Sequence, residues 1–406
     1  EETFMEVVRP VLSRLSLRVA TGYTGNINKT VKPNLMMKYY KNFRISDDEN
    51  YRMGYINNAP NPKLRWEKTR DVKVALDFGL WKDRINGIVE AYWRKSKDCV
   101  TSEYVPVTTG FFNQSYNTSV LQNNGVEFSL SVAVLKSKDY NLSVSANVAW
   151  NQNKLKKYNS PNTSLALDKY VGYPMGAVFS GKYEGIDPET GMYKFKLRPD
   201  AVTNKDGYLR EPNNYYYYLG TSVAPFTGGF NLNFSYKNIG LSVGGSYSVK
   251  AKMVDNIESP AGYELLSGSK LESIPTPHND LYRNHLNVKR EVRNRWTPEN
   301  RTGVKYPRLI DAYGKKLGLD LTNPTLTTIT RGALLEDISY LRINTIALSY
   351  SLPQRVLERI NFSSAALNLT LNNFFTITKY SGIDPEVPGA TYPVSRSVTI
   401  GLNVGF

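Results

Sequence analysis

Two histidines, His278 and His285, are the side chains best suited to acid–base or metal chemistry, and Asp280 lies between them. A metal site or a His/Asp hydrolase pair would use such groups, but their spacing matches no common ligand pattern. The sequence also has no G-x-S-x-G elbow, no P-loop and no dinucleotide fingerprint. We therefore expect no catalytic residue, no metal and no cofactor, and we interpret both histidines as solvated loop residues.

An acidic phrase occurs twice in the chain. Tyr183-Glu-Gly-Ile-Asp-Pro-Glu189 is echoed by Tyr380-Ser-Gly-Ile-Asp-Pro-Glu386, each at the edge of an expected strand. Clustered carboxylates would suit Ca²⁺, whereas Asp-Pro beside Gly is turn chemistry. We favour turns.

Aromatic and basic residues in two loop-like segments are the candidate contact residues. They are Tyr215, Tyr216, Tyr217 and Tyr218 in the first segment, and Arg293, Arg295 and Trp296 in the second. Exposed aromatic rings bind sugar faces or peptide side chains, and the same rings are common at interfaces with a partner protein. Contact with a ligand and contact with a partner both stay open here.

The elements that would carry these loops are predicted by a period-two alternation of apolar and small polar residues. In residues 72–80, 126–134 and 142–150 one side is apolar and the other is small and polar, and across the expected strands these polar sides are rich in Ser, Gly, Ala, Asn and Thr. Further strands are expected near 15–25, 85–93, 226–236, 241–249, 346–350, 367–377 and 398–406. This predicts about ten strands, and one further pair is expected between residues 158 and 224, at 178–195.

The connections between these strands alternate in length. Short links are expected at 82–84, 137–139 and 237–238, and long ones at 25–64, 99–123, 157–225, 252–333 and 379–396. Outer-membrane barrels place short turns on the periplasmic side and long loops outside. A soluble sandwich also alternates, but its polar face carries many Lys and Glu, whereas these faces are small and polar. The pattern predicts an all-β, antiparallel transmembrane β-barrel with long extracellular loops.

Composition agrees with a barrel. The mean hydropathy is −0.42, with 41% hydrophobic residues, and no run is long enough for a transmembrane helix. Barrel strands average out as hydrophilic because they alternate between lipid and water. Trp81 and Trp150 suit the aromatic girdle at the lipid interface. The single cysteine, Cys99, rules out an intramolecular disulfide.

The net charge of +15 would suit nucleic acid, because Lys and Arg neutralise phosphates. Much of the basic excess, however, lies in expected loops. The basic residues in these expected loops include Arg283, Lys289, Arg290, Arg293, Arg295, Arg301, Lys305 and Arg308. We expect a basic outer rim that faces anionic lipopolysaccharide or an acidic partner, and no nucleic acid.

The two ends of the sequence add to this prediction. The start, Glu1-Glu2-Thr3, has no initiator Met and no signal peptide, so we expect it to be internal to a longer product. The last residues alternate apolar with small and end on Phe406. An amphipathic final strand with an aromatic terminus is typical of bacterial outer-membrane proteins.

Several motifs, in order along nearly the whole chain, resemble SusC-like (RagA-like) importers. They are Leu64-Arg-Trp-Glu-Lys-Thr69, Leu76-Asp-Phe-Gly-Leu80, Arg84-Ile-Asn-Gly87, Asn124-Gly-Val-Glu-Phe128, Arg295-Trp-Thr-Pro-Glu-Asn300, Tyr340-Leu-Arg-Ile-Asn344, Leu348-Ser-Tyr-Ser-Leu-Pro353 and the stretch from Asn372 to Glu386. The resemblance implies a 22-stranded barrel with an N-terminal plug. The chain would then be the C-terminal ten to twelve strands, 1–406 being part of a single barrel domain without the plug and the first strands.

The resemblance also implies a function and partners. These are TonB-dependent uptake of oligosaccharides or oligopeptides across the outer membrane of a Gram-negative, Bacteroidota-like cell, together with a SusD-like surface lipoprotein that covers the extracellular mouth. The partners would be this lipoprotein, the TonB system acting through the missing N-terminal part, the remaining barrel strands and the lipid. The alternative is a SusC-like barrel that acts as a structural or assembly scaffold of a larger outer-membrane complex, and an outer-membrane hydrolase is the third possibility.

Overall fold

The computed structural model describes residues 10–27, 37–39, 54–56, 59–111, 113–158, 171–189, 193–196, 216–254, 293–304, 335–388 and 392–406, with single positions at 8, 31, 34, 191, 198, 199 and 332. The chain divides into two compact units. Unit 1 comprises Glu1–Val134 and Ser143–Met175, and unit 2 comprises Leu135–Leu142 and Gly176–Phe406.

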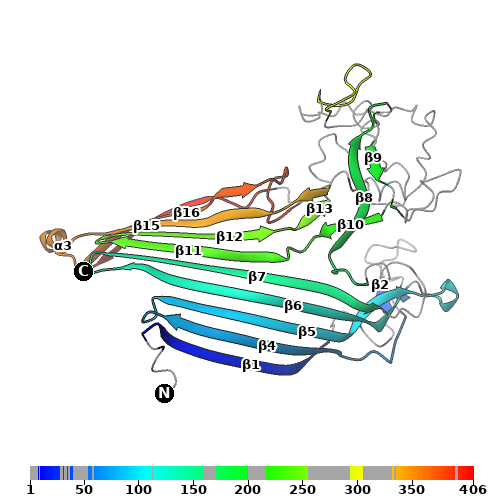
Figure 1. Ribbon diagram of the computed structural model, residues 1–406, viewed down its shortest axis with the longest axis horizontal. Helices are drawn as coiled ribbons and strands as arrows, with labels where there is room; N and C mark the ends of the chain where they lie inside the picture. The colour runs from blue at the N-terminus through cyan, green and yellow to red at the C-terminus, as the bar shows by residue number, and fades with distance from the viewer. Residues whose placement is uncertain are drawn as a thin grey trace, which may run out of the picture. The chain divides into compact units, whose positions relative to one another are not determined.

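Unit 1 is built on five long strands (Figure 1). They are β1 (Leu12–Asn26), β4 (Glu67–Leu80), β5 (Ile85–Tyr104), β6 (Asn113–Lys136) and β7 (Tyr140–Tyr158), paired in that order. The β1–β4, β4–β5 and β5–β6 pairs are antiparallel. A short pair, β2 (Met37–Tyr39) and β3 (Gly54–Ile56), lies in the connection after β1.

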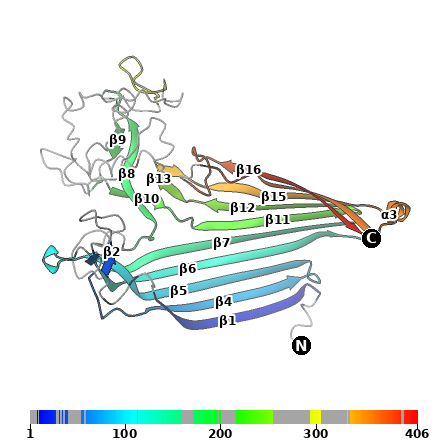
Figure 2. The same ribbon diagram turned by 180° about the vertical axis from the view of Figure 1, so that it is seen from behind.

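Unit 2 contains a second run of five neighbouring strands, seen from behind in Figure 2. They are β11 (Phe226–Tyr236), β12 (Ile239–Val249), β15 (Tyr340–Ser351), β16 (Ser364–Thr378) and β17 (Ser397–Gly405). All four pairs are antiparallel. With unit 1 this makes ten long strands, so the predicted all-β antiparallel class is confirmed, while the count of 22 for a complete barrel stays a prediction.

The extra strand pair expected at 178–195 exists but does not join the ten long strands. β8 (Ala177–Ile186) pairs with β9 (Tyr193–Lys196) and with β10 (Tyr216–Thr221) in a separate three-stranded sheet. Another small pair, β13 (Lys252–Val254) with β14 (Leu335–Asp337), continues the connection between β12 and β15. Placing the 178–195 pair in the wall was therefore wrong: alternation predicts a strand but not which sheet it joins.

The loop expected at 99–123 is mostly strand. β5 continues to Tyr104 and β6 begins at Asn113, so the two strands stay paired as far as Tyr104 and Asn113. The register shifts between Ser96 and Val100. This bulge hides the extension in the sequence, because an extra residue breaks the period of two.

A short helix, α3 (Gln354–Ile360), connects β15 and β16 and was not expected. It follows Pro353 and ends at Asn361, which adopts a left-handed conformation with φ 55°. In the described part of the chain, no helix has the length and apolar character needed to span a membrane.

Short turns gather at one end of the strands within each unit. In unit 1 the turn between β4 and β5 contains Trp81, Lys82 and Asp83, all with positive φ, and the N–H of Trp81 donates to Val11 at 2.7 Å. In unit 2 Lys237 turns between β11 and β12 with φ 48°. Long connections leave the opposite end, so the turn end is the periplasmic end and the loop end is extracellular.

The strands have one exposed apolar face, which we call the outer face. In unit 1 it carries Leu15, Leu17 and Val19 of β1, and in unit 2 it carries Leu367, Ile400 and Leu402, which are 47–73% exposed. The registers place Leu17 beside Leu76 and Leu369 beside Ile400, so apolar residues line up across strands. Such apolar surface suits a lipid environment, and the predicted arrangement of one apolar and one polar face is confirmed.

Candidate functional site: the inner face and its extracellular end

The opposite face of the strands, here called the inner face, is small and uncharged in unit 2. Facing pairs on it include Asn231 with Gly244, Asn233 with Ser242 and Thr370 with Thr399. Arg342 is the one charged residue in the five strands β11, β12, β15, β16 and β17. Donors and acceptors without charge make this face a hydrogen-bonding surface for water or a polar solute.

The inner face of unit 1 is charged and internally paired. Arg18 of β1 binds Asp77 of β4 through two contacts of 2.6 and 3.0 Å. One strand further, Arg94 contacts Asp71 at 2.8 Å, and Lys73 contacts Glu90 at 3.2 Å. These pairs are partly exposed, so each contributes little to stability. Their effect is to cancel these six charges while keeping the face polar.

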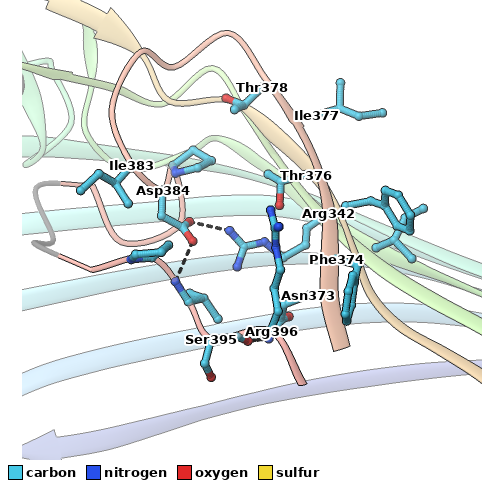
Figure 3. Close-up of a pocket in the computed structure, with 15 residues that line it drawn as sticks. Arg342, Asn373, Phe374, Thr376, Ile377, Thr378, Ile383, Asp384, Ser395 and Arg396 are labelled. Atoms are coloured by element: carbon cyan, nitrogen blue, oxygen red, sulfur yellow. Dashed lines mark hydrogen bonds and ion pairs between the residues drawn. The ribbon is translucent and has the colours of Figure 1, made fainter. Parts of the chain in front are cut away.

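Arg342 forms the most deeply buried ion pair in the described residues. It lies on the inner face near the extracellular end of β15, opposite Thr376 of β16. Its guanidinium binds the carboxylate of Asp384, and Nη1 lies 3.0 Å from Oε2 of Glu386. Figure 3 shows this contact between Arg342 and Asp384. Their side chains are only 3% and 6% exposed. Residues 384 and 386 are thereby held against the end of β15.

Asp384 also organises its own segment. Its carboxylate accepts hydrogen bonds from the N–H of Glu386 at 2.9 Å and of Val394 at 3.2 Å. Burial alone would raise the pKa of Asp384, but these N–H groups and Arg342 stabilise the charged form, and the net result is a lowered pKa. The side chain thus joins both ends of the 384–394 segment to β15.

The repeated acidic phrases are both turns. Asp187 of the first phrase accepts a hydrogen bond from the N–H of Glu189 at 2.9 Å, as Asp384 does from Glu386. This is the side-chain turn that Asp favours. Within the described residues, no group of three or more His, Cys, Asp and Glu side chains could hold a metal ion.

A cavity of about 830 Å³ lies beside the Arg342 ion pair. Its lining includes Asn373 and Phe374 of β16 together with Ser395 and Arg396 from the segment before β17 (Figure 3). Asn373 has a positive φ of 59°, and its amide donates to the carbonyl of Ser395 at 3.0 Å. Most of the other lining residues are apolar, among them Ile343, Ile377, Ile383 and Val394, so the cavity is a mainly apolar hollow with a few polar groups beside the ion pair.

Sequence reasoning did not identify Arg342 as a site residue. Its signal is present nonetheless, because it is a single charge in a strand that otherwise alternates Leu, Ile and Tyr with uncharged residues. Its partner Asp384 lies 42 positions away, and no local spacing rule connects the two.

Two of the four candidate tyrosines have described side chains. The ring of Tyr218 lies 5.7 Å from that of Phe179 on β8, and Lys182 lies 5.9 Å from the ring of Tyr217. Tyr216 belongs to β10, where it is paired with Gly181. Tyr218 is exposed and Tyr217 is half-buried. Tyr215 lies outside the described residues, as do His278, Asp280 and His285.

The second candidate segment is anchored by Trp296. This side chain is buried, and its indole N–H donates to the carbonyl of Pro188 at 2.9 Å, within the first acidic phrase. Arg293 is exposed and Arg295 is half-buried. Each of the two acidic phrases is therefore contacted by a residue distant in sequence. Trp296 donates a hydrogen bond to the 183–189 phrase, and Arg342 forms an ion pair with the 380–386 phrase.

Comparisons with known proteins give a consistent result. The chain is 26% identical to the TonB-dependent receptor SusC of Bacteroides thetaiotaomicron and 25% identical to the TonB-dependent receptor P26 of Formosa agariphila, over 100% of its own length. It covers 39% and 41% of these relatives, so it spans about two fifths of their length. No family model matches.

Solved structures agree with the curated relatives. The RagAB peptide transporter matches with a TM-score of 0.74 and 25% identity, over 99% of this chain and 42% of that chain. The RagAB peptide importer in its closed-closed state also gives a TM-score of 0.74, with 26% identity over 98% of this chain and 41% of that chain. The relatives are receptors and transporters, not enzymes. The chain is a SusC-like, RagA-like β-barrel chain of the TonB-dependent outer-membrane transporter kind.

Proposed function

We propose that the whole protein imports oligosaccharides or oligopeptides across the outer membrane in a TonB-dependent manner. The chain would supply the C-terminal ten long strands of a single 22-stranded barrel domain, and the plug and first strands would belong to the part that precedes it. No bond of the cargo is made or broken. The outer face would meet lipid, and the inner face would meet water and cargo.

The observation that carries this proposal is the contrast between the two faces of the strands. Exposed Leu, Ile and Val form the outer face, whereas Asn, Ser, Thr and Gly form the inner face of unit 2. An uncharged hydrogen-bonding wall lets a polar cargo exchange water for protein contacts without burying an unpaired charge. The paired charges of unit 1 meet the same requirement, because Arg18, Lys73 and Arg94 each have a carboxylate.

A SusD-like surface lipoprotein is the proposed partner at the extracellular end. The candidate contacts for this partner or for cargo are Tyr215, Tyr216, Tyr217, Tyr218, Arg293, Arg295 and Trp296. Tyr218 is exposed, so its ring can stack on a sugar or a peptide side chain. Trp296 is buried, so we propose that it shapes the surface that Arg293 and Arg295 present.

The experiment is uptake by cells that carry the full-length gene. A deletion strain would be complemented with the wild-type gene or with one lacking the TonB-contacting segment, and supplied with pools of oligosaccharides or of oligopeptides. We expect only the wild-type gene to restore consumption of one pool. Purification of the tagged protein should recover a SusD-like lipoprotein.

The same experiment separates transport from the scaffold alternative. A scaffold would leave consumption of both pools unchanged in the deletion strain, and its tagged form would bring down other outer-membrane proteins without a SusD-like lipoprotein. The basic loops favour partner docking of some kind, since the chain carries a net charge of +15. Consumption that needs no TonB contact would contradict the import proposal.

A further inference from the structure

Four basic side chains form a patch on the outer face of unit 1, at the extracellular end of β4 and β5. Lys68 and Arg70 of β4 lie directly opposite Lys97 and Lys95 of β5. These four residues are named the outer basic patch. All are exposed, and within the described part of the chain none of them has an ion pair or a hydrogen bond through its side chain.

The register makes this arrangement unfavourable without a counter-charge. Like charges directly opposite each other on neighbouring strands repel, and here two such pairs follow one another on the same face. The nearest carboxylates do not relieve the repulsion. Glu67 points to the inner face, where it accepts hydrogen bonds from Asn26 and from the N–H of Val100, and Asp98 is bound to Arg65 at 2.8 Å.

The height of the patch along the strands places it at the lipid headgroups. The apolar stretch of β4 covers residues 72–80, close to the length of about 9 to 11 residues that a transmembrane strand needs. Trp93, opposite Val72, closes this stretch at its extracellular end, and Tyr23 lies opposite Arg70; both rings are strongly exposed. Lys68 and Arg70 therefore lie roughly 5–10 Å beyond the hydrocarbon edge, allowing for strand rise and tilt.

Polar amides border the patch on the next strand. Gln122 of β6 lies opposite Lys95, and its amide donates to Asn124 at 3.1 Å. Asn124 in turn lies opposite Trp93. The surface therefore combines four cations, an aromatic edge and hydrogen-bonding amides at one level, which is the chemistry that binds phosphate groups at a membrane surface.

We infer that the outer basic patch binds the phosphate groups of lipopolysaccharide in the outer leaflet. Lysine and arginine bind lipid phosphates at this depth, and their aliphatic stems can lie along the apolar band. Each phosphate would sit between a pair of facing cations and remove their repulsion. This inference depends on the outer-membrane location and not on the proposed cargo or its import.

The test uses the full-length protein purified in detergent and incubated with lipopolysaccharide, either intact or enzymatically dephosphorylated. Bound lipid would be measured by native mass spectrometry. The variant replaces all four cations: Lys68→Gln, Arg70→Gln, Lys95→Gln and Lys97→Gln. The matched control is Lys82→Gln with Lys138→Gln, two exposed lysines at the turn end.

We expect wild type and control to retain intact lipopolysaccharide at least about tenfold better than the four-site variant, because each cation near an anionic surface contributes about a factor of five. We expect wild type and the four-site variant to bind dephosphorylated lipopolysaccharide equally weakly. The inference would be overturned if the four-site variant retained intact lipopolysaccharide as well as wild type does, or if wild type bound dephosphorylated lipid as well as intact lipid. Patch-dependent capture of an acidic protein with no lipid retained would overturn it too.

A folding control keeps the test decisive. Folded barrels migrate differently from unfolded ones on gels run without heating, and the four-site variant must pass this test. A charge-preserving variant, Lys68→Arg with Lys95→Arg and Lys97→Arg, should retain intact lipopolysaccharide. Its failure to retain lipid while folded would count against recognition by charge. Uptake assays on the same variants report separately on the proposed import.

Discussion

Arg342 on β15 and Asp384, in the segment before β17, form an ion pair with both side chains almost fully buried. The carboxylate of Asp384 is also held by the N–H groups of Glu386 and Val394, and Glu386 approaches the second guanidinium nitrogen. The single charged residue in strands β11, β12, β15, β16 and β17 thus holds residues 384 and 386, and Asp384 in turn holds residue 394. Because a buried ion pair holds this segment, we expect a substitution of either Arg342 or Asp384 to displace it.

Removing one partner of this pair should release the segment. Asp384→Asn leaves the buried Arg342 charge with only the exposed carboxylate of Glu386, and losing the buried partner of such a pair costs up to about 3–5 kcal/mol. We expect protease cleavage within residues 379–396 of the folded protein to accelerate strongly, while the strands stay intact. Arg342→Met with Asp384→Leu removes both charges and should be less affected than the single change. Equal cleavage of wild type and Asp384→Asn would show that the ion pair does not hold the segment.

The lowered pKa of Asp384 sets the direction of a pH effect. A carboxylate with a folded pKa below its unfolded value stabilises the segment above the unfolded pKa, near 4, and this contribution is lost as pH falls through the folded value. Cleavage of the 379–396 segment by an acid-tolerant protease should therefore change little between pH 7 and pH 5, and rise below about pH 4. The Asp384→Asn protein should lack this rise. A midpoint between pH 5 and 7 would point to a different group.

The two faces of the strands were predictable from sequence because side chains alternate with a period of two. Leu76 and Asp77 fall on opposite faces for this reason alone, and the structure confirms it. The 99–123 segment was misjudged because the bulge after Ser96 interrupts the period, and α3 was missed since a short helix lies among strand signals. Long-range partners such as Arg342 and Asp384 have no local signal, because the fold alone brings them together.

Trp296 offers a test of whether a candidate contact residue binds cargo or supports a loop. Trp296→Phe removes the hydrogen bond to the carbonyl of Pro188 but keeps an aromatic ring, and should cost about 1 kcal/mol. We expect slightly faster proteolysis of residues 293–304 and unchanged cargo binding by the full-length protein. Trp296→Ala should weaken both, since it leaves a cavity under the loop. Loss of cargo binding in Trp296→Phe with normal proteolysis would instead assign the indole to cargo.

The assignment of the two faces can be tested by placing a charge on neighbouring residues of one strand. Leu369 and Thr370 are adjacent in β16; Leu369 lies between Leu348 and Ile400 on the outer face, and Thr370 lies between Ala347 and Thr399 on the inner face. A lysine on the lipid face costs about 2–4 kcal/mol at the membrane midplane, whereas the inner face meets water. We expect Leu369→Lys to reduce the amount of folded protein in the outer membrane several-fold, and Thr370→Lys to assemble normally. Because both variants add the same charge one residue apart, loss of assembly in Thr370→Lys but not in Leu369→Lys would reverse the two faces.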